Sequence, residues 1–409
     1  MKRFGLLGEK LGHSYSPQIH RLLGAYEYPL YEKSADEVAA FLQHDGFDGI
    51  NVTIPYKKTV MPFCAELSDT VRRIGSVNTV VRRADGTLAG FNTDYDGFRW
   101  MVARSGINVA GKTALVLGSG GASLTVRTVL ADLGAKRVTV ISRRGEHNYD
   151  NMDRTAQIIA NATPVGMYPN VGAAPVDLAQ FPNCEGVLDV IYNPARTQLL
   201  LDAERLGIPH ENGLSMLVAQ AKRSAELFLG TAIDDGVTER ILGTLARQMR
   251  NLVLIGMPGC GKSTAGAAVA QALGRRFVDA DAEIVRAAGC SIPEIFEKEG
   301  EAGFRARETA VLAELGKQSG LVIATGGGCV TQPRNYPLLH QNGWLIWMQR
   351  PADELPRDGR PLSAHADLAQ MAAQREPLYR SFADVSVPVA SSPAKTQRRI
   401  LEAQEKMRV

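Results

Sequence analysis

The chain has 409 residues, of which 45% are hydrophobic and 22% are charged, and its formal net charge is +3. At about 150 residues per domain this length favours two or three domains, and the composition is that of packed globular proteins rather than disordered ones. The 46 basic residues nearly balance the 43 acidic ones and form no clustered stripe, which argues against nucleic acid as a partner.

Apolar strand-like runs alternate with helix-like segments through most of the chain. This alternation is typical of an α/β fold with parallel sheets and crossover helices. A helical stretch, residues 237–249, ends at Arg250-Asn251 directly before a new apolar strand, and we place the main domain boundary there. The expected strands are residues 114–117, 138–142, 187–190, 252–255, 277–278, 322–325 and 345–348.

Polar motifs flank the first of these strands. They are G-H-S-Y-S-P at residues 12–17, N-V-T-I-P-Y-K at 51–57, S-V-N-T at 76–79, F-N-T-D at 91–94, N-A-T-P-V-G-M at 161–167 and G-L-S-M-L-V-A-Q-A at 213–221. In this order they resemble the shikimate dehydrogenase family, from Met1 to about Met249. The resemblance implies an α/β substrate domain followed by a Rossmann-like nucleotide domain.

The same resemblance implies roles for individual residues in this part of the chain. Ser14 and Ser16 would bind the substrate carboxylate, and Lys57 and Asp94 would form the catalytic pair. Reduction of a ketone needs a proton at the developing alkoxide, and a lysine ammonium fixed by a carboxylate is a suitable donor. The residues implied to bind ring hydroxyls or to orient the ring are Asn51, Thr53, Asn78, Tyr192 and Gln220.

A glycine-rich turn, G-S-G-G-A-S at residues 118–123, joins the strand at 114–117 to a helix-like run and predicts a dinucleotide site. The next strand ends in Ser142-Arg143-Arg144, where an NAD site would carry Asp or Glu, so we expect NADP. The family's usual helix and strand are missing between Arg144 and Gln157, which predicts a reduced adenosine wall. The expected cofactor contacts are Gly118, Gly120, Gly121, Ala122, Ser142, Arg143 and Arg144, and the resemblance adds Asn161, Thr163 and Gly213.

The strand at 252–255 runs into G-M-P-G-C-G-K-S-T at residues 256–264, a phosphate-binding loop in its strand–loop–helix setting. Its backbone N–H groups and helix amino terminus favour phosphate, Lys262 reaches the outer phosphates, and Ser263 can bind Mg²⁺. The expected ATP contacts in this loop are Gly256, Gly259, Cys260, Gly261, Lys262, Ser263 and Thr264.

Later motifs narrow the phosphate acceptor. They are F-V-D-A-D at residues 277–281, G-F-R-A-R-E at 303–308, A-T-G-G-G at 324–328, G-R-P-L at 359–362 and R-E-P-L-Y at 375–379. In this order they resemble shikimate kinase over residues 251–409, in which we expect a P-loop domain with a parallel sheet. The resemblance implies that Asp281 binds the acceptor and acts as base, that Asp279 lies toward Mg²⁺, and that Arg360 comes from a lid onto ATP. It implies that Arg305, Arg375, Gly326, Gly327 and Gly328 hold the acceptor. The segment 351–362 is shorter than the family's usual lid.

Together these patterns predict a bifunctional enzyme of aromatic amino acid biosynthesis. NADPH would reduce 3-dehydroshikimate to shikimate, and ATP with Mg²⁺ would phosphorylate shikimate at the hydroxyl so created. The expected domains are residues 1–105 with 210–249 for substrate, 106–209 for NADP and 251–409 for the kinase. Two alternatives stay open for the first half: a quinate or polyol-acid dehydrogenase using NAD, and a non-catalytic ligand-sensing module.

The five cysteines are scattered and form no C-x-x-C pair, which is typical of reduced thiols in a cytoplasmic protein. The apolar run at the amino terminus is too short for a signal peptide, and no run of about 18 apolar residues occurs. We therefore expect neither export nor a membrane partner, and the spacing of the histidines predicts no zinc site.

Overall fold

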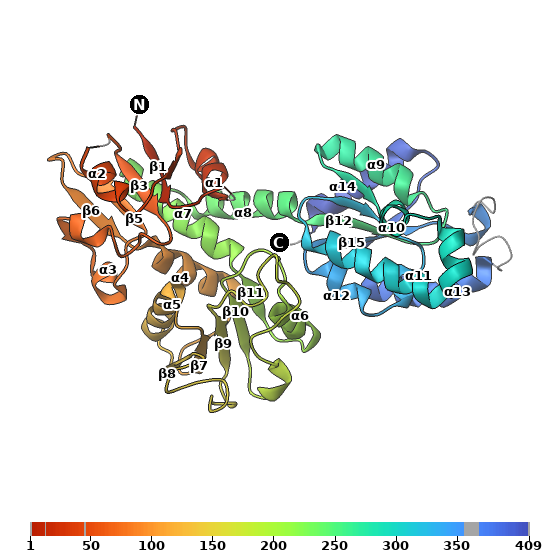
Figure 1. Cartoon of the computed structure of the whole chain (residues 1–409), viewed down its shortest axis with the longest axis horizontal. Helices are drawn as coiled ribbons and strands as arrows, with labels where there is room; N and C mark the ends of the chain where they lie inside the picture. Colours follow the sequence, from red (N-terminus) through yellow and green to blue (C-terminus); the bar gives the residue numbers. More distant parts are fainter. Residues whose placement is uncertain (1, 13, 45, 356–367, 408–409) are drawn as a thin grey trace. The chain divides into compact units, whose positions relative to one another are not determined.

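The computed structural model describes residues 2–12, 14–44, 46–355 and 368–407. They belong to two compact units, coloured red to green and green to blue in Figure 1. The main division lies between Thr244 and Leu245, within the helix α8 (Asp235–Met249) that ends where the sequence places the domain boundary. Within the described residues, no helix is both long and apolar enough to cross a membrane. The first unit is formed by Met1–Gly166, Ala173–Tyr192 and Asp202–Thr244, and the second by Met167–Gly172, Asn193–Leu201 and Leu245–Val409.

A six-stranded sheet opens the first unit, with the strand order β2-β1-β3-β5-β6-β4. The neighbours β3, β5 and β6 pair antiparallel, and the other pairs are parallel. Its strands are β1 (Phe4–Gly8), β2 (Leu30–Glu32), β3 (Gly49–Val52), β4 (Glu66–Leu67), β5 (Thr79–Arg82) and β6 (Leu88–Phe91). The accompanying helices are α1 (Ser16–Leu23), α2 (Glu37–His44), η1 (Met61–Phe63), α3 (Asp69–Ile74), α4 (Thr93–Ser105) and α7 (Leu214–Leu229).

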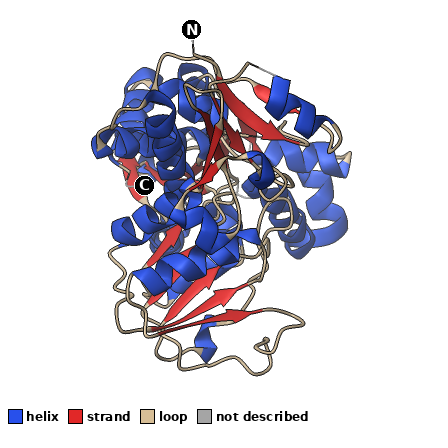
Figure 2. Ribbon diagram, turned by 90° about the vertical axis from the view of Figure 1, so that its left-hand side faces the viewer, coloured by secondary structure: helices blue, strands red, loops and turns tan. Residues whose placement is uncertain are grey.

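A second sheet in this unit has five parallel strands in the order β11-β10-β9-β7-β8. Residues 142–157, between β8 and β9, contain no helix or strand, so β8 forms the edge of the sheet. The chain leaves β7 toward β8 on one side and returns to β9 on the other, which makes the carboxyl ends of β7 and β9 the switch point where ligands bind. Figure 2 shows the helices of the chain (blue) packed along its strands (red), as in other α/β folds. The elements are β7 (Thr113–Leu117), α5 (Gly121–Asp132), β8 (Arg137–Ile141), β9 (Ile158–Asn161), η2 (Leu178–Gln180), β10 (Gly186–Asp189), α6 (Gln198–Arg205) and β11 (His210–Asn212).

The sheet of the second unit has five parallel strands in the order β13-β14-β12-β15-β16. The strand β12 is buried along its whole length, as expected for a central strand that helices cover on both faces. Figure 1 shows α9 and α14 on one side of this sheet and α11 and α12 on the other. The strands are β12 (Asn251–Ile255), β13 (Phe277–Asp279), β14 (Val322–Ala324), β15 (Gly343–Gln349) and β16 (Val385–Pro388). The helices are α9 (Lys262–Leu273), α10 (Ala280–Ala288), α11 (Ile292–Lys317), η3 (Cys329–Thr331), α12 (Asn335–His340), η4 (Ala352–Glu354), α13 (Leu368–Phe382) and α14 (Pro393–Lys406).

Candidate functional sites

A cavity of about 850 Å³ lies in the first unit, where the ends of β3 and β10 meet the first turns of α1, α4, α5 and α7. The predicted catalytic pair and every predicted substrate residue of this half line it, although they come from segments far apart in the sequence. These residues are Ser14, Ser16, Asn51, Thr53, Lys57, Asn78, Asp94, Tyr192 and Gln220. Three of the predicted cofactor residues line it as well, namely Gly121, Ala122 and Gly213.

The predicted catalytic pair forms an ion pair in this cavity. Lys57 Nζ donates to Asp94 Oδ2 at 2.5 Å, and the two side chains are 30% and 20% exposed. Asp94 lies in the first turn of α4, which Asn92 caps by accepting a hydrogen bond from the Tyr95 N–H at 3.3 Å. The cap fixes the turn that carries the carboxylate, and the carboxylate fixes the ammonium. The arrangement can deliver a proton to an oxygen atom of a bound ligand.

Buried hydrogen bonds hold the two asparagines on the cavity wall. Tyr28 donates its hydroxyl proton to Asn51 Oδ1 at 2.6 Å, and Asn51 Nδ2 donates to Ser224 Oγ at 2.7 Å. Asn78 Oδ1 accepts from the Thr93 N–H at 2.7 Å, and Asn78 Nδ2 donates to the Thr93 hydroxyl at 3.0 Å. These bonds fix both amides before any ligand binds. Sequence reasoning missed Tyr28, Thr93 and Ser224, because their roles depend on contacts such as Asn51 to Ser224, across 173 positions.

The glycine-rich turn after β7 is shaped to accept a dinucleotide. Gly118 has φ +101°, and a Cβ there would lie 2.8 Å from Thr163 Cγ2, so only glycine fits. Buried Asn161 accepts from the Thr163 N–H at 3.0 Å and hydroxyl at 2.7 Å, which holds Thr163 against the turn. A Cβ at Gly120 would meet nothing within 4 Å, so the space over the amino terminus of α5 is open to a pyrophosphate.

The other predicted cofactor residues surround this turn without lining the cavity. Arg143 and Arg144 follow β8 and are exposed, and neither forms an ion pair with another residue that the structure describes. The loop after them closes on itself through the Ser142 N–H, which donates to the His147 carbonyl at 3.1 Å. The predicted residues outside the cavity lining are Gly118, Gly120, Ser142, Arg143, Arg144, Asn161 and Thr163.

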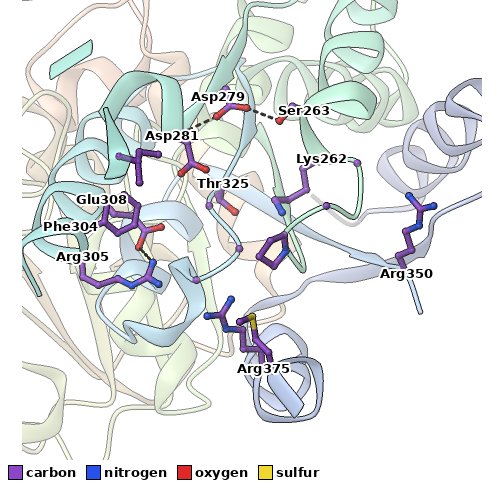
Figure 3. A pocket seen from close by; sticks show the side chains of 18 of the residues that line it. Lys262, Ser263, Asp279, Asp281, Phe304, Arg305, Glu308, Thr325, Arg350 and Arg375 are labelled. Atoms are coloured by element: carbon purple, nitrogen blue, oxygen red, sulfur yellow. Dashed lines mark hydrogen bonds and ion pairs between the residues drawn. The ribbon is translucent and has the colours of Figure 1, made fainter. Parts of the chain in front are cut away.

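A second cavity, of about 560 Å³, lies at the carboxyl edge of the sheet in the second unit (Figure 3). Twelve of the predicted kinase residues line it: Gly259, Gly261, Lys262, Ser263, Thr264, Asp279, Asp281, Arg305, Gly326, Gly327, Gly328 and Arg375. Gly256 and Cys260 belong to the loop but do not line the cavity, and the Cys260 side chain is fully buried. The predicted lid residue Arg360 lies outside the described residues.

The phosphate-binding loop has its lysine folded back onto its own backbone. Lys262 is 8% exposed, and its Nζ donates to the carbonyls of Gly256 at 2.8 Å and Met257 at 3.0 Å. A Cβ at Gly256 would lie 2.6 Å from the Met348 carbonyl, so glycine lets the loop start against β15. The ammonium is thus held against the backbone carbonyls of the loop.

Two oxygen donors of the predicted magnesium site lie together. Ser263 donates its hydroxyl proton to Asp279 Oδ2 at 2.6 Å, and Asp279 Oδ1 caps α10 by accepting from the Asp281 N–H at 3.0 Å. A serine hydroxyl and a carboxylate are hard oxygen ligands, which Mg²⁺ prefers together with phosphate oxygens. The residues therefore fit the ion.

Arg305 and Glu308 form a buried pair at the other end of the cavity. Arg305 Nη1 donates to Glu308 Oε2 at 2.8 Å, and Glu308 is fully buried. Burial raises the pKa of the Glu308 carboxyl, although Arg305 opposes the shift. A Cβ at Gly326 would lie 2.7 Å from Glu308 Oε1 and 2.9 Å from Asp281 Oδ1, and one at Gly328 would clash with the Arg305 guanidinium. The glycines therefore let charged groups approach the acceptor site closely.

Two charged lining residues of this cavity, Glu308 and Arg350, were missed by sequence reasoning. Glu308 lies within the G-F-R-A-R-E motif and could have been found from its i,i+3 spacing to Arg305, which places both on one helix face. Arg350 follows β15 outside any motif, so only the fold brings it to the cavity.

Comparison with known families follows the two units. Residues 6–80 match the family model of the shikimate dehydrogenase substrate binding domain, and residues 258–405 match that of shikimate kinase. The shikimate dehydrogenase (NADP(+)) of Clostridium perfringens is 35% identical over 264 residues, which cover 59% of this chain and 97% of that protein.

Solved structures agree with the amino-terminal match. The chorismate mutase/shikimate 5-dehydrogenase fusion protein from Clostridium acetobutylicum is 38% identical with a TM-score of 0.56, over 60% of this chain and 96% of that one. Shikimate 5-dehydrogenase from Thermus thermophilus, in complex with NADP(H) and shikimate, is 30% identical with a TM-score of 0.54, over 59% and 98%.

Proposed function

We propose that the two cavities are the two active sites of a bifunctional enzyme of the shikimate pathway. The chain belongs to the shikimate dehydrogenase family in its first part and carries a shikimate kinase domain in its second. The first cavity reduces 3-dehydroshikimate to shikimate. The second phosphorylates shikimate at the hydroxyl that the first reaction creates. The observation that carries the proposal is that the predicted catalytic and substrate-binding residues of each site all line one cavity.

In the first cavity, Lys57 is the proton donor. Its ammonium is held by Asp94 at 2.5 Å and delivers a proton to the ketone oxygen as negative charge develops there. The hydroxyls of Ser14 and Ser16 bind the substrate carboxylate. The amides of Asn51 and Asn78 orient the ring, and their own bonds to Ser224 and Thr93 support this role because they hold the amides in one position.

NADP(H) fits the turn after β7 in this proposal. When bound there, NADPH would supply the hydride for reduction of the ketone. The open space above Gly120 takes the pyrophosphate, and the exposed Arg143 and Arg144 take the 2′-phosphate. NADP(H) in the related structure from Thermus thermophilus supports the choice.

In the second cavity, Asp281 accepts the proton of the attacking shikimate hydroxyl. Arg305 and Arg375 hold the substrate carboxylate, because guanidinium groups match carboxylates with two parallel hydrogen bonds. Lys262 turns from its loop carbonyls to the outer phosphates of ATP. Mg²⁺, when bound at Ser263 and Asp279, neutralises charge on the phosphate oxygens.

The domain limits in this proposal are residues 1–105 with 210–249 for the dehydrogenase substrate, 106–209 for NADP and 251–409 for the kinase. The separate sheets support these limits except at β11 (His210–Asn212), which pairs with β10 in the sheet of the NADP part. The five free cysteines support a cytoplasmic location.

One incubation tests both activities. Purified protein is given 3-dehydroshikimate, NADPH and Mg-ATP, and the products are identified by mass. We expect oxidation of NADPH and accumulation of shikimate 3-phosphate. Shikimate without phosphate would reject the kinase site, and unreacted 3-dehydroshikimate together with phosphorylation of supplied shikimate would reject the dehydrogenase site.

A further inference from the structure

Arg350 lies beside the phosphate-binding loop although it belongs to no recognised motif. It is the residue after β15, and β15 pairs with β12, the strand that leads into the loop, with Trp347 opposite Ile255. A Cβ at Gly256 would lie only 2.6 Å from the Met348 carbonyl oxygen, so β15 packs closely against the start of the loop. Because parallel strands end at the same edge, Arg350 and the loop lie at one edge of the sheet, and Arg350 lines the second cavity.

The guanidinium of Arg350 is only weakly satisfied by the protein. Its Nε is buried and forms no hydrogen bond with any described residue. Its ion pair with Glu354 has an Nε to Oε2 separation of 3.6 Å, and the two side chains are 32% and 58% exposed. That separation is too long for a hydrogen bond, and a half-exposed pair contributes little. Arg350 therefore keeps donor capacity for a ligand in the cavity.

Two of the other three cations that line the cavity, Arg305 and Lys262, differ from Arg350 in this respect. Arg305 is bonded to Glu308, and Lys262 is bonded to carbonyls of its own loop. In Figure 3 Arg350 lies on the far side of Lys262 from Arg305 and Glu308. Arg350 thus belongs to the nucleotide end of the cavity, away from the acceptor end.

We propose that Arg350 is a nucleotide-binding residue that pairs with the phosphate chain of ATP, and that Glu354 competes with the nucleotide for it. The proposal rests on the kinase activity proposed above. A guanidinium offers donors in a planar fork that matches phosphate oxygens, and a charge-assisted bond of this kind is stronger than the long pair with Glu354. When ATP binds, its phosphate oxygens then replace Glu354 as the partner of Arg350.

Substitutions of Arg350 and of Glu354 should change the KM for ATP in opposite directions. Arg350→Met keeps the length of the side chain and removes the charge, and we expect it to raise the KM for ATP about 10-fold or more. Glu354→Gln removes the competing carboxylate, and we expect it to lower this KM by about two- to threefold. In both variants the KM for shikimate and the dehydrogenase activity should stay unchanged.

The chain offers a matched control outside the cavity. Arg398 and Glu402 on α14 form an i,i+4 ion pair whose Nε to Oε1 separation is also 3.6 Å. Arg398→Met and Glu402→Gln remove the same charges from an exposed pair on α14 and should not change the KM for ATP. Calorimetric binding of ADP and of tripolyphosphate to the full-length variants separates a phosphate contact from a base contact.

The outcomes are distinct. Weaker binding of both ADP and tripolyphosphate to Arg350→Met, with a lower KM for ATP in Glu354→Gln, supports the proposal. Loss of ADP binding with normal tripolyphosphate binding, an unchanged KM in Arg350→Met, or an equal change in Arg398→Met overturns it. A wild-type enzyme that does not phosphorylate shikimate would instead reject the proposed kinase function.

Discussion

At the scale of single residues, both proposed active sites hold charged side chains in contact with a partner of opposite charge. Asp94 holds Lys57 at 2.5 Å, and Glu308 holds Arg305 at 2.8 Å. A partner of opposite charge fixes a long side chain in one conformation, so the cost of ordering that side chain falls before the substrate arrives. Removing Lys57 or Arg305 should therefore affect only the reaction of the cavity in which that residue lies.

Lys57→Ala should lower dehydrogenase turnover by about 10²–10⁴-fold, the usual contribution of a general acid. Phosphorylation of supplied shikimate should remain at the wild-type rate, because Lys57 lies in the first unit and the kinase cavity in the second. NADPH oxidation and shikimate 3-phosphate formation are measured on the same preparation. Wild-type NADPH oxidation by the variant would remove Lys57 from the role of proton donor.

His20 is a buried residue whose ionisation opposes folding. Its ring is 1% exposed and stacks on Tyr28 with centroids 3.9 Å apart, and Nδ1 shares a hydrogen bond with the Tyr26 hydroxyl at 2.7 Å. Burial lowers the pKa of the imidazole from 6.5 to about 3. Between these values the unfolded chain binds a proton that the folded chain does not, so stability falls as pH decreases below about 6.5.

At pH 5 this difference should cost the fold about 2 kcal/mol relative to pH 7. His20→Gln has no charge to gain, so the decrease in its free energy of unfolding from pH 7 to pH 5 should be smaller than that of wild type by about this amount. Urea unfolding, followed by loss of dehydrogenase activity, measures both proteins. Equal pH dependence would show that His20 is not responsible.

At the scale of elements, the sequence predicted seven of the ten described strands of the two all-parallel sheets. It missed β9, β11 and β16 there, and every strand of the six-stranded sheet. The seven predicted strands are confirmed as β7, β8, β10, β12, β13, β14 and β15, because buried parallel strands are continuous apolar runs. Strands such as β2 (Leu30–Glu32) and β4 (Glu66–Leu67) were missed because they are too short to show an apolar run or an alternation of apolar and polar residues.

The motifs predicted the cavity linings for a similar reason. Most described motifs lie at the end of a strand or the start of a helix, so their side chains meet at one sheet edge. G-F-R-A-R-E and R-E-P-L-Y instead lie within α11 and α13. Tyr28 and Ser224 lie outside such positions and act through a buried network that no local pattern reveals. The position of Arg350 depends on the pairing of β15 with β12, which again is a property of the fold.

Because the segment at residues 142–157 is short, we expect few side chains to determine the selectivity for NADPH over NADH. With no further strand beyond β8, Arg143 and Arg144 are the cations that follow the strand end. Arg143→Ala should raise the KM for NADPH about 10-fold and leave that for NADH nearly unchanged, because only NADPH carries the 2′-phosphate. Steady-state kinetics with both cofactors tests this. A wild-type preference for NADH would contradict the NADP assignment, and equal losses with both cofactors would indicate a structural effect.

At the scale of the whole molecule, the chain joins two units that each bury their own core and hold their own cavity. The product of the first proposed reaction is the acceptor in the second, and both act on the same oxygen. Because each cavity is lined by residues of one unit, a substitution in one should leave the chemistry of the other intact.

Asp281→Asn tests this independence in the coupled reaction. The substitution preserves the size of the side chain and removes the negative charge that, in the proposed function, deprotonates the acceptor hydroxyl. The loop with Lys262 and the Ser263 to Asp279 contact do not depend on that charge, so ATP should still bind. With 3-dehydroshikimate, NADPH and Mg-ATP supplied, we expect NADPH to be consumed at the wild-type rate while shikimate accumulates and its phosphate falls by about 10²-fold or more. Normal phosphorylation by the variant would dismiss Asp281 as the base, and slower NADPH consumption would show that the state of the kinase site affects the dehydrogenase.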